Sequence, residues 1–285
     1  MKPEEAYELL KSQVKDQRIS HNSLDLVKEI YLESIDELKT YNKVSLISKV
    51  PTKRYISFEH SGKETRAINE GLFTLDKTLP LSFLENVPSK TVQTVLSASE
   101  ITKAVYCIAM SFCAYIDITK SNDQKTPGTW FEYLMGILIA FELEVEPINA
   151  IQVLNMDLET SLTTDFIFNL GTDKAKFHVP IKTSTRERVI QVWAHQRVID
   201  GVYGVGRFRC LLMCLAETKK DRRKKEVVEI CLPNQWMIYQ LFISQLTRVY
   251  YLDLPDAYIP LGMKFPPLHV KQFGEFYYEL TALCS

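Results

Sequence analysis

Hydrophobic residues spaced three or four positions apart predict helices at the start of the chain. The positions that follow this spacing are Leu24, Val27, Tyr31, Ile35 and Leu38. We therefore expect residues 1–40 to be helical. Residues 90–115 are apolar on most helical faces, which predicts a buried helix. Between them, residues 41–90 hold one possible strand at 55–59 and several turn residues, and we expect loop-rich surface there.

The pattern changes after residue 125. Residues 126–144 predict a nearly all-apolar core helix. Short runs typical of strands follow, at 149–155, 164–170, 176–182, 209–216 and 227–232. Helices are expected at 185–200 and 235–250. Strands interleaved with helices predict an α/β fold with its core over residues 101–285, and residues 1–100 are expected to form a mainly helical N-terminal region.

Composition indicates an ordinary globular protein. The chain has 285 residues, 46% of them hydrophobic, which is enough to bury a substantial core. Its net charge of −1 gives no overall positive field, so any DNA-binding surface would be a local concentration of Lys and Arg. The N-terminus alternates acids and bases, and the longest apolar stretches are shorter than the roughly 20 residues of a membrane span. We expect a cytoplasmic protein with no membrane partner.

The six cysteines indicate free thiols. No two form a CxxC pair, and most lie in apolar runs, as expected of core thiols in a reducing compartment. The five histidines are scattered, which argues against a structural zinc site. A bound metal would then be a hard cation held by carboxylates.

Glu132 is the single charge in residues 130–135 of the predicted core helix. A carboxylate on an apolar stripe needs a partner. Two explanations fit the sequence: Thr129 and Glu132 have the spacing of a capping box at a helix start, or Glu132 serves in a reaction.

Asp165 and Lys182 lie at the ends of neighbouring strand-like runs. An acid and a base in these places could face the same space. The structural alternatives are that Asp165 is a turn residue after Thr163 and Thr164, and that Lys182 is a solvated strand end.

Arg186, Glu187 and Arg188 occupy the first turn of the helix expected at 185–200. Two arginines there oppose the helix dipole, at up to about 1 kcal/mol each, which indicates a partner outside the helix. Arg can contact guanine and Glu can accept from cytosine, although a solvated turn also fits. Further along, Gln196 directs an amide toward the core side, and Trp193 is expected in the core.

The basic run KKDRRKKE at residues 219–226 lies between two predicted strands. Such a run is usually an exposed hairpin loop. The alternative is contact with DNA phosphates, which would position DNA without reading its sequence.

Three segments, in this order, resemble the type II restriction endonucleases of the PD-(D/E)XK superfamily, in particular the branch that reads CCGG and CCNGG. GTWFEYLMGI is similar to that branch's helix with an active-site glutamate, here Glu132. TDFIF is similar to its Pro-Asp strand, here Asp165, and IKTSTRERVIQVWAHQ to its lysine-bearing strand end, here Lys182, with the helix after it. The resemblance covers residues 126–200 and implies a mixed β-sheet flanked by helices.

The chain departs from this branch at two positions. The usual acid two residues before the lysine is Pro180, and the branch supplies the missing acid 13 or 14 residues after the lysine. Those positions hold His195 and Gln196, and an amide is a weaker Mg²⁺ ligand than a carboxylate. Either Gln196 is a neutral or water-mediated ligand, or this chain cleaves slowly.

The resemblance implies a homodimeric, Mg²⁺-dependent enzyme that hydrolyses both strands of double-stranded DNA at a short palindromic site. The implied catalytic residues are Glu132, Asp165, Lys182 and Gln196, of which Asp165, Glu132 and Gln196 would hold the metal. Arg186, Glu187 and Arg188 would read a CC/GG core, and the host would carry a matching DNA methyltransferase. Two alternatives stay open: a sequence-specific DNA-binding protein that does not cut, and a repair or recombination nuclease of the same fold.

Overall fold

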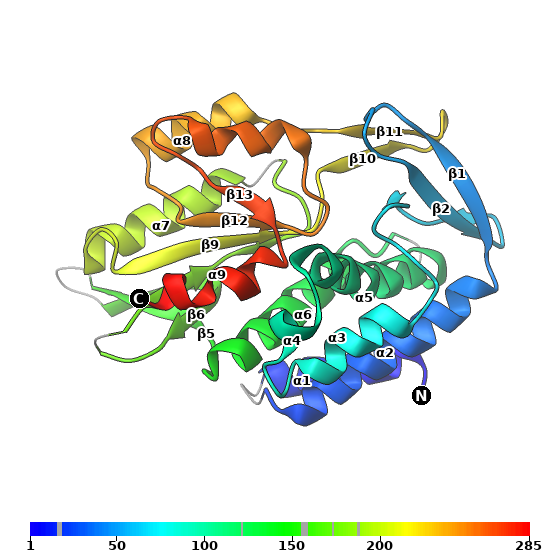
Figure 1. The fold of residues 1–285 in the computed structure, drawn as a ribbon, viewed down its shortest axis with the longest axis horizontal. Coiled ribbons are helices and arrows are strands. Elements are labelled where there is room, and N and C mark those ends of the chain that lie inside the picture. The colour runs from blue at the N-terminus through cyan, green and yellow to red at the C-terminus, as the bar shows by residue number, and fades with distance from the viewer. Residues whose placement is uncertain (16–18, 121, 155–158, 173, 187–188) are drawn as a thin grey trace.

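The structure, a computed structural model, describes all residues except 16–18, 121, 155–158, 173 and 187–188, and at 154 and 159 it describes the backbone alone. Figure 1 shows a large sheet with helices on both sides and a smaller sheet at one end of the molecule.

The large sheet contains seven strands among the described residues. Their spatial order is β13-β12-β9-β7-β6-β5, with β8 paired to β9. The neighbours β5, β6 and β7 are antiparallel, whereas β7, β8 and β12 run parallel to β9, and β13 runs parallel to β12. Their bounds are β5 Ile148–Leu154, β6 Glu159–Asn169, β7 Lys176–Val179, β8 Ile181–Lys182, β9 Phe208–Cys214, β12 Arg248–Tyr251 and β13 Val270–Gln272. The sheet is therefore mixed, as expected.

Helices cover both faces of this sheet. Along β9, Leu211 and Met213 belong to the hydrophobic cluster of α5 and α6, whereas Leu212 and Cys214 belong to the cluster of α7 and α8. Because successive strand residues point to opposite faces, this alternation places a helical layer on each side. The bounds are α5 Ala98–Thr119, α6 Lys125–Leu143, α7 Val189–Tyr203 and α8 Pro233–Phe242.

The remaining helices pack with α5 into one hydrophobic cluster. They are α1 Pro3–Lys15, α2 His21–Lys39, α3 Thr78–Asn86, α4 Val92–Val95 and α9 Glu275–Cys284. In the part of the chain that is described, α5 is the one helix long and apolar enough to cross a membrane, and 89% of its apolar window is buried inside the protein. This helix is therefore a core helix, as predicted. The hydrophobic cluster contains residues from both sides of position 100. The division of the chain near residue 100 therefore stays a prediction.

The smaller sheet corrects the expectation of loop-rich surface at 41–90. Its order is β10-β11-β1-β2-β3, and β4 also pairs with β2. The strands are β1 Asn42–Ser48, β2 Tyr55–His60, β3 Lys63–Glu64, β4 Ile68–Asn69, β10 Thr218–Asp221 and β11 Glu226–Glu229. The basic run at 219–226 is thus a hairpin whose strand β11 pairs with β1 from the N-terminal region. Short strands with distant partners leave little local signal.

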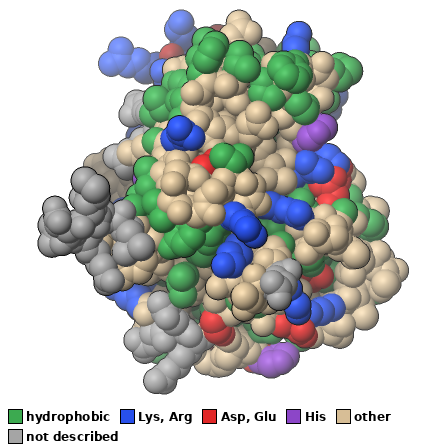
Figure 2. Space-filling model, turned by 90° about the vertical axis from the view of Figure 1, so that its left-hand side faces the viewer, with side chains coloured by type: hydrophobic (Ala, Val, Ile, Leu, Met, Phe, Trp, Pro, Cys, Tyr) green, Lys and Arg blue, Asp and Glu red, His purple; other side chains and the backbone are tan. Residues whose placement is uncertain are grey.

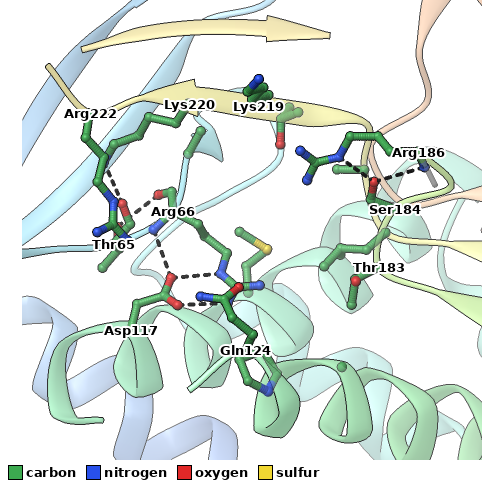
Figure 3. A pocket seen from close by; sticks show the side chains of 17 residues that line it. Thr65, Arg66, Asp117, Gln124, Thr183, Ser184, Arg186, Lys219, Lys220 and Arg222 are labelled. Atoms are coloured by element: carbon green, nitrogen blue, oxygen red, sulfur yellow. Dashed lines mark hydrogen bonds and ion pairs between the residues drawn. The ribbon is translucent and has the colours of Figure 1, made fainter. Parts of the chain in front are cut away.

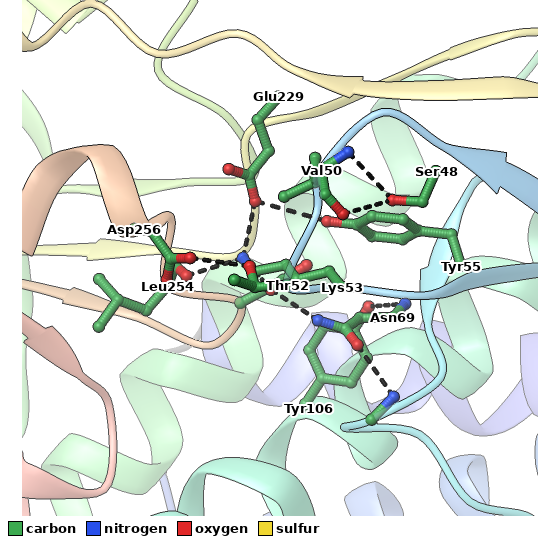
Figure 4. A network of polar contacts seen from close by, with 12 residues as sticks. Ser48, Val50, Thr52, Lys53, Tyr55, Asn69, Tyr106, Glu229, Leu254 and Asp256 are labelled. Carbon is green, nitrogen blue, oxygen red and sulfur yellow. Dashed lines mark hydrogen bonds and ion pairs between the residues drawn. The ribbon is translucent and has the colours of Figure 1, made fainter.

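A buried ion cluster joins the two sheets (Figure 4). The Lys53 Nζ donates to Glu229 Oε1 of β11 at 2.7 Å and to Asp253 Oδ1, just after β12, at 2.7 Å. Asp253 Oδ1 also accepts from Asn69 Nδ2 at 2.9 Å, so β4 is tied to the same carboxylate. Burial lowers the pKa of Lys53, but the two carboxylates more than offset this, so its pKa is raised and it stays charged.

Two helix predictions need correction. The helix expected at 235–250 ends at Phe242, and β12 occupies Arg248–Tyr251 instead. Among the described residues, the helix expected from 185 begins at Val189. The 3₁₀ segment η1 Asp256–Met263 follows β12. Trp193 is fully buried against Trp236, which confirms its place in the core.

Figure 2 shows the left-hand side of the molecule, where hydrophobic atoms gather near the top, at the height of α8 in Figure 1. On one face of α8, Ile238, Leu241 and Phe242 are exposed, and the exposed fraction of Phe242 is 76%. All six cysteines are free, and four of them are buried, as expected.

Candidate active site

An open pocket of about 550 Å³ lies where α6, β6 and β8 meet. Of the residues predicted to act in catalysis, it brings together Glu132 from α6, Asp165 from β6 and Lys182 from β8. The other residues that line it are Gln124, Lys125, Gly128, Thr129, Ile181, Thr183, Ser184 and Arg186.

Asp165 and Lys182 form an ion pair at the edge of this pocket. Lys182 Nζ lies 2.7 Å from Asp165 Oδ2, and the backbone N–H of Ile181 donates to the same oxygen at 2.7 Å. The two side chains are about a quarter exposed, at 25% and 24%. Asp165 Oδ1 has no hydrogen bond from the described residues, so it is free to take a ligand. Neither the turn nor the solvated strand end explains these two residues.

Glu132 faces the same pocket from the second turn of α6. The helix begins at Lys125, so Thr129 lies inside it, and the capping box is wrong. The position of α6 depends on Gly136, because a Cβ there would come within 2.5 Å of the Phe166 ring on β6. One turn before this close approach, Glu132 is held near the strand that carries Asp165.

The surroundings of Glu132 make its charge unfavourable. Burial and, to a smaller extent, the charge of Asp165 raise the pKa of Glu132 to about 7, against the opposing effect of Lys182. A cation placed beside this carboxyl would stabilise its charged form.

Glu217 orients the loop that follows Lys182. Its carboxylate accepts from the Thr185 backbone N–H at 2.9 Å, from the Thr185 hydroxyl at 2.6 Å and from Ser184 Oγ at 3.3 Å. Tyr251 OH of β12 donates to it at 2.7 Å. Glu217 is only 1% exposed, and burial raises its pKa. Sequence reasoning missed this residue, since an acid just after a strand carries no signal of its distant partners.

Gln196 is not brought to the pocket. It is 1% exposed, and its Nε2 donates to Asp200 Oδ1 at 2.9 Å and to the Phe208 carbonyl at 3.0 Å. Its Oε1 therefore accepts from His178 Nδ1 at 2.9 Å, while His178 Nε2 bonds to Thr164 Oγ1 at 2.9 Å. Burial lowers the pKa of His178 to about 4, so the ring is neutral. All the polar atoms of the Gln196 amide are thus used inside the protein, which argues against a metal-ligand role.

His195 is also absent from the described residues that line the pocket. Burial and the charge of Lys182 lower its pKa, and Asp165 raises it, so the ring lies within reach of the ion pair's field. Neither His195 nor Gln196, at the two positions where the family supplies an acid, therefore lines the pocket.

Arg186 lies in the loop before α7, not in the helix itself, which corrects the first-turn placement. Its side chain is exposed, lines the pocket and donates from Nε to Ser184 Oγ at 2.9 Å. Glu187 and Arg188 lie outside the described residues.

The carboxylates of the pocket suit a magnesium ion. Among the described residues there is no group of three or more His, Cys, Asp or Glu that could hold a metal. Mg²⁺, however, is usually held by one or two carboxylates together with water and substrate phosphates. Asp165 and Glu132 are two such groups in one open pocket, so the residues present fit this ion.

The chain is similar in structure to the type IIP restriction endonuclease Kpn2I, with a TM-score of 0.82 and 23% identity over 98% of this chain and 96% of that one. It is also similar to the restriction endonuclease PspGI, solved as a complex with substrate DNA, with a TM-score of 0.41 and 13% identity over 70% of this chain and 91% of that one. No protein-family model and no curated protein matches the chain. The likeness to Kpn2I shows a restriction-endonuclease fold, as expected.

Proposed function

We propose that this chain is a type II restriction endonuclease, which hydrolyses both strands of duplex DNA at a short palindromic site with a CC/GG core and needs Mg²⁺. The observation that carries the proposal is the ion pair of Asp165 and Lys182, which faces Glu132 across one open pocket. The fold similar to that of Kpn2I supports the same reading.

Each side chain has a distinct task in the proposed reaction. Asp165 and Glu132 would hold Mg²⁺, which when bound supplies a Lewis acid for the scissile phosphate. Asp165 Oδ2 keeps the Lys182 ammonium at a set place in the pocket. From there the Lys182 ammonium orients the attacking water and electrostatically favours loss of its proton to solvent, and its charge offsets negative charge that develops on the phosphate.

Readout of the bases is proposed for Arg186 on guanine, with Glu187 and Arg188 completing the CC/GG contacts. The exposed Arg186 beside the pocket supports this, since a reader of bases must lie within reach of the cleavage centre. Each good bidentate contact discriminates by about 1 to 3 kcal/mol.

A palindromic site implies two copies of the chain, because a two-fold protein reads a two-fold sequence. We therefore propose a homodimer in which each subunit cuts one strand. Sedimentation should give twice the chain mass of 32.9 kDa.

Digestion of a plasmid of known sequence, with Mg²⁺ or with EDTA, tests the proposal. We expect discrete, Mg²⁺-dependent fragments whose sequenced ends share one palindrome. Binding to specific sites without cuts would instead indicate a DNA-binding protein, and ends without a common sequence would indicate a repair or recombination nuclease.

The assignment of the pocket is tested with Asp165→Ala and Lys182→Ala. Each should lower the cleavage rate at least about 100-fold in a folded protein, because each removes a group that acts on the reacting phosphate. Lys264→Ala is the control, since Lys264 is exposed, lies outside this pocket and has no ion pair with a described residue. Full activity of either active-site variant would contradict the assignment.

A further inference from the structure

A second pocket, of about 300 Å³, adjoins the candidate active site. The two share a wall made by the start of α6 and the loop after Lys182; the shared residues are Gln124, Gly128, Thr183, Ser184 and Arg186. Its far wall comes from β10 of the basic hairpin and from the segment between β3 and β4. Figure 3 shows Arg186 and Arg222 on opposite sides of this pocket.

Positive charge predominates in the second pocket. Five Lys or Arg residues and one acid, Asp117, line it. Asp117 is already occupied by Arg66, whose Nε and Nη2 each donate to it at 2.8 Å. Lys220 is held by an acid outside the pocket and by a backbone carbonyl. Lys219 and Arg222, by contrast, are exposed and have no ion pair or hydrogen bond from their side chains to any described residue.

Hydroxyl groups also line the pocket. Those of Thr65 and Ser184 already donate to the Arg66 carbonyl and to Glu217, whereas the hydroxyls of Thr183 and Thr218 make no hydrogen bond to a described residue. Unpaired cations together with hydroxyl donors are the groups that proteins direct at DNA phosphates. The geometry is held in place by Glu217, which precedes β10 and binds Ser184 and Thr185 of the shared wall. Glu217 therefore connects the wall formed by β10 to the wall that the two pockets share.

We propose that the second pocket binds backbone phosphates of duplex DNA beside the scissile bond, through Lys219 and Arg222. This inference rests on the proposed function, in which duplex DNA is the substrate. The shared wall makes the pocket the continuation of the path that a strand follows out of the cleavage centre, so Lys219 and Arg222 set the register of that strand without reading its bases.

The test measures binding of the full-length protein in EDTA to a fluorescent random-sequence duplex of about 30 base pairs, over a range of salt concentrations. Each phosphate contact contributes about 0.9 to the slope of log affinity against log salt. We expect Lys219→Gln with Arg222→Gln to weaken binding about 10-fold or more and to make the slope shallower by about 2.

Arg223→Gln with Lys224→Gln is the matched control. Both residues are exposed on the same hairpin and outside the pocket, and the double variant loses the same formal charge. The control should change the slope by less than about half a unit. Equal effects in the two double variants, or none in either, would overturn the proposal.

Plasmid cleavage by the same proteins separates this inference from the proposed function. If the wild type cuts at a palindrome but the two double variants bind alike, the phosphate pocket is wrong and the endonuclease stands. If binding depends on Lys219 and Arg222 but neither the wild type nor any variant cuts with Mg²⁺, the pocket stands as a site for DNA phosphates and the endonuclease is wrong.

Discussion

Gln196 differs from an acid at the same place by the two hydrogen bonds that its NH₂ group donates to Asp200 and to the Phe208 carbonyl. A glutamate there would face both acceptors with no proton, next to a carboxylate that is only 8% exposed. Gln196→Glu should therefore lower the free energy of unfolding by about 3 kcal/mol or more at neutral pH and should not raise the cleavage rate. Denaturant unfolding and plasmid cleavage measure the two effects.

Gln191→Glu is the control for this change, because the same substitution falls on an exposed position of the same helix. It should alter stability by less than about 0.5 kcal/mol. A stable Gln196→Glu variant with faster cleavage would show instead that this position can serve the metal.

Glu132 makes the metal-free protein less stable as pH rises. Its pKa is about 7 in the folded chain, above the ordinary 4.5, so the folded state binds more protons than the unfolded state between these values. Stability contributed by the protonated form is present below about pH 4.5 and is lost as pH rises through 7. Glu132→Gln removes this dependence.

We expect Glu132→Gln to be more stable than wild type by about 2 to 3 kcal/mol near pH 8 in EDTA, and equally stable near pH 4. Denaturant unfolding at both pH values measures the difference, with Glu33→Gln, on an exposed part of α2, as the control. A difference that does not change with pH would contradict the expected titration.

At the scale of elements, hydrophobic periodicity predicted those helices and strands whose pattern lies in their own local sequence. The apolar spacing in α2, α5 and α6 and the short strands β5, β7 and β9 occur close to their predicted places. Spacing and the family resemblance also pointed to Glu132, Asp165 and Lys182, and these three residues line one pocket in the structure. The smaller sheet was missed because β1 pairs with β11, which lies far along the chain. The roles of Gln196 and Glu217 were missed because buried hydrogen bonds depend on tertiary contacts.

The loop between β8 and α7 depends on Glu217. Glu217→Ala removes the acceptor of the Thr185 N–H and hydroxyl and of Ser184, so Lys182 and Arg186 at the two ends of the loop lose their relative placement. We expect the cleavage rate to fall about 100-fold, because small misplacements of catalytic groups have effects of this size. Preference for the cognate site over sites with one changed base should fall as well.

Tyr251→Phe is the control for the clamp on this loop. It removes one donor to Glu217 but leaves the bonds from Thr185 and Ser184 in place. Its cleavage rate and site preference should stay within about threefold of wild type. If Glu217→Ala lowered stability but kept its site preference, Glu217 would be a purely structural residue.

The whole molecule depends on how the smaller sheet is attached to the larger one, since β10 carries the proposed phosphate contacts. The attachment at Lys53 is nearly dry: the exposed fractions of the Lys53, Glu229 and Asp253 side chains are 10%, 11% and 2%. Asp253 Oδ2 is buried without a hydrogen-bond partner among the described residues, so the cluster already holds more negative charge than it satisfies.

Lys53→Met would leave both carboxylates buried without their cation. Removing one partner of a buried ion pair typically lowers stability by about 3 to 5 kcal/mol, and we expect a loss of this size in denaturant unfolding. Adding Asp253→Asn and Glu229→Gln to Lys53→Met should recover part of it, because the uncompensated charges are then gone. A loss below about 1 kcal/mol would mean that water reaches the cluster, and that the two sheets are held together by their hydrophobic contacts rather than by Lys53.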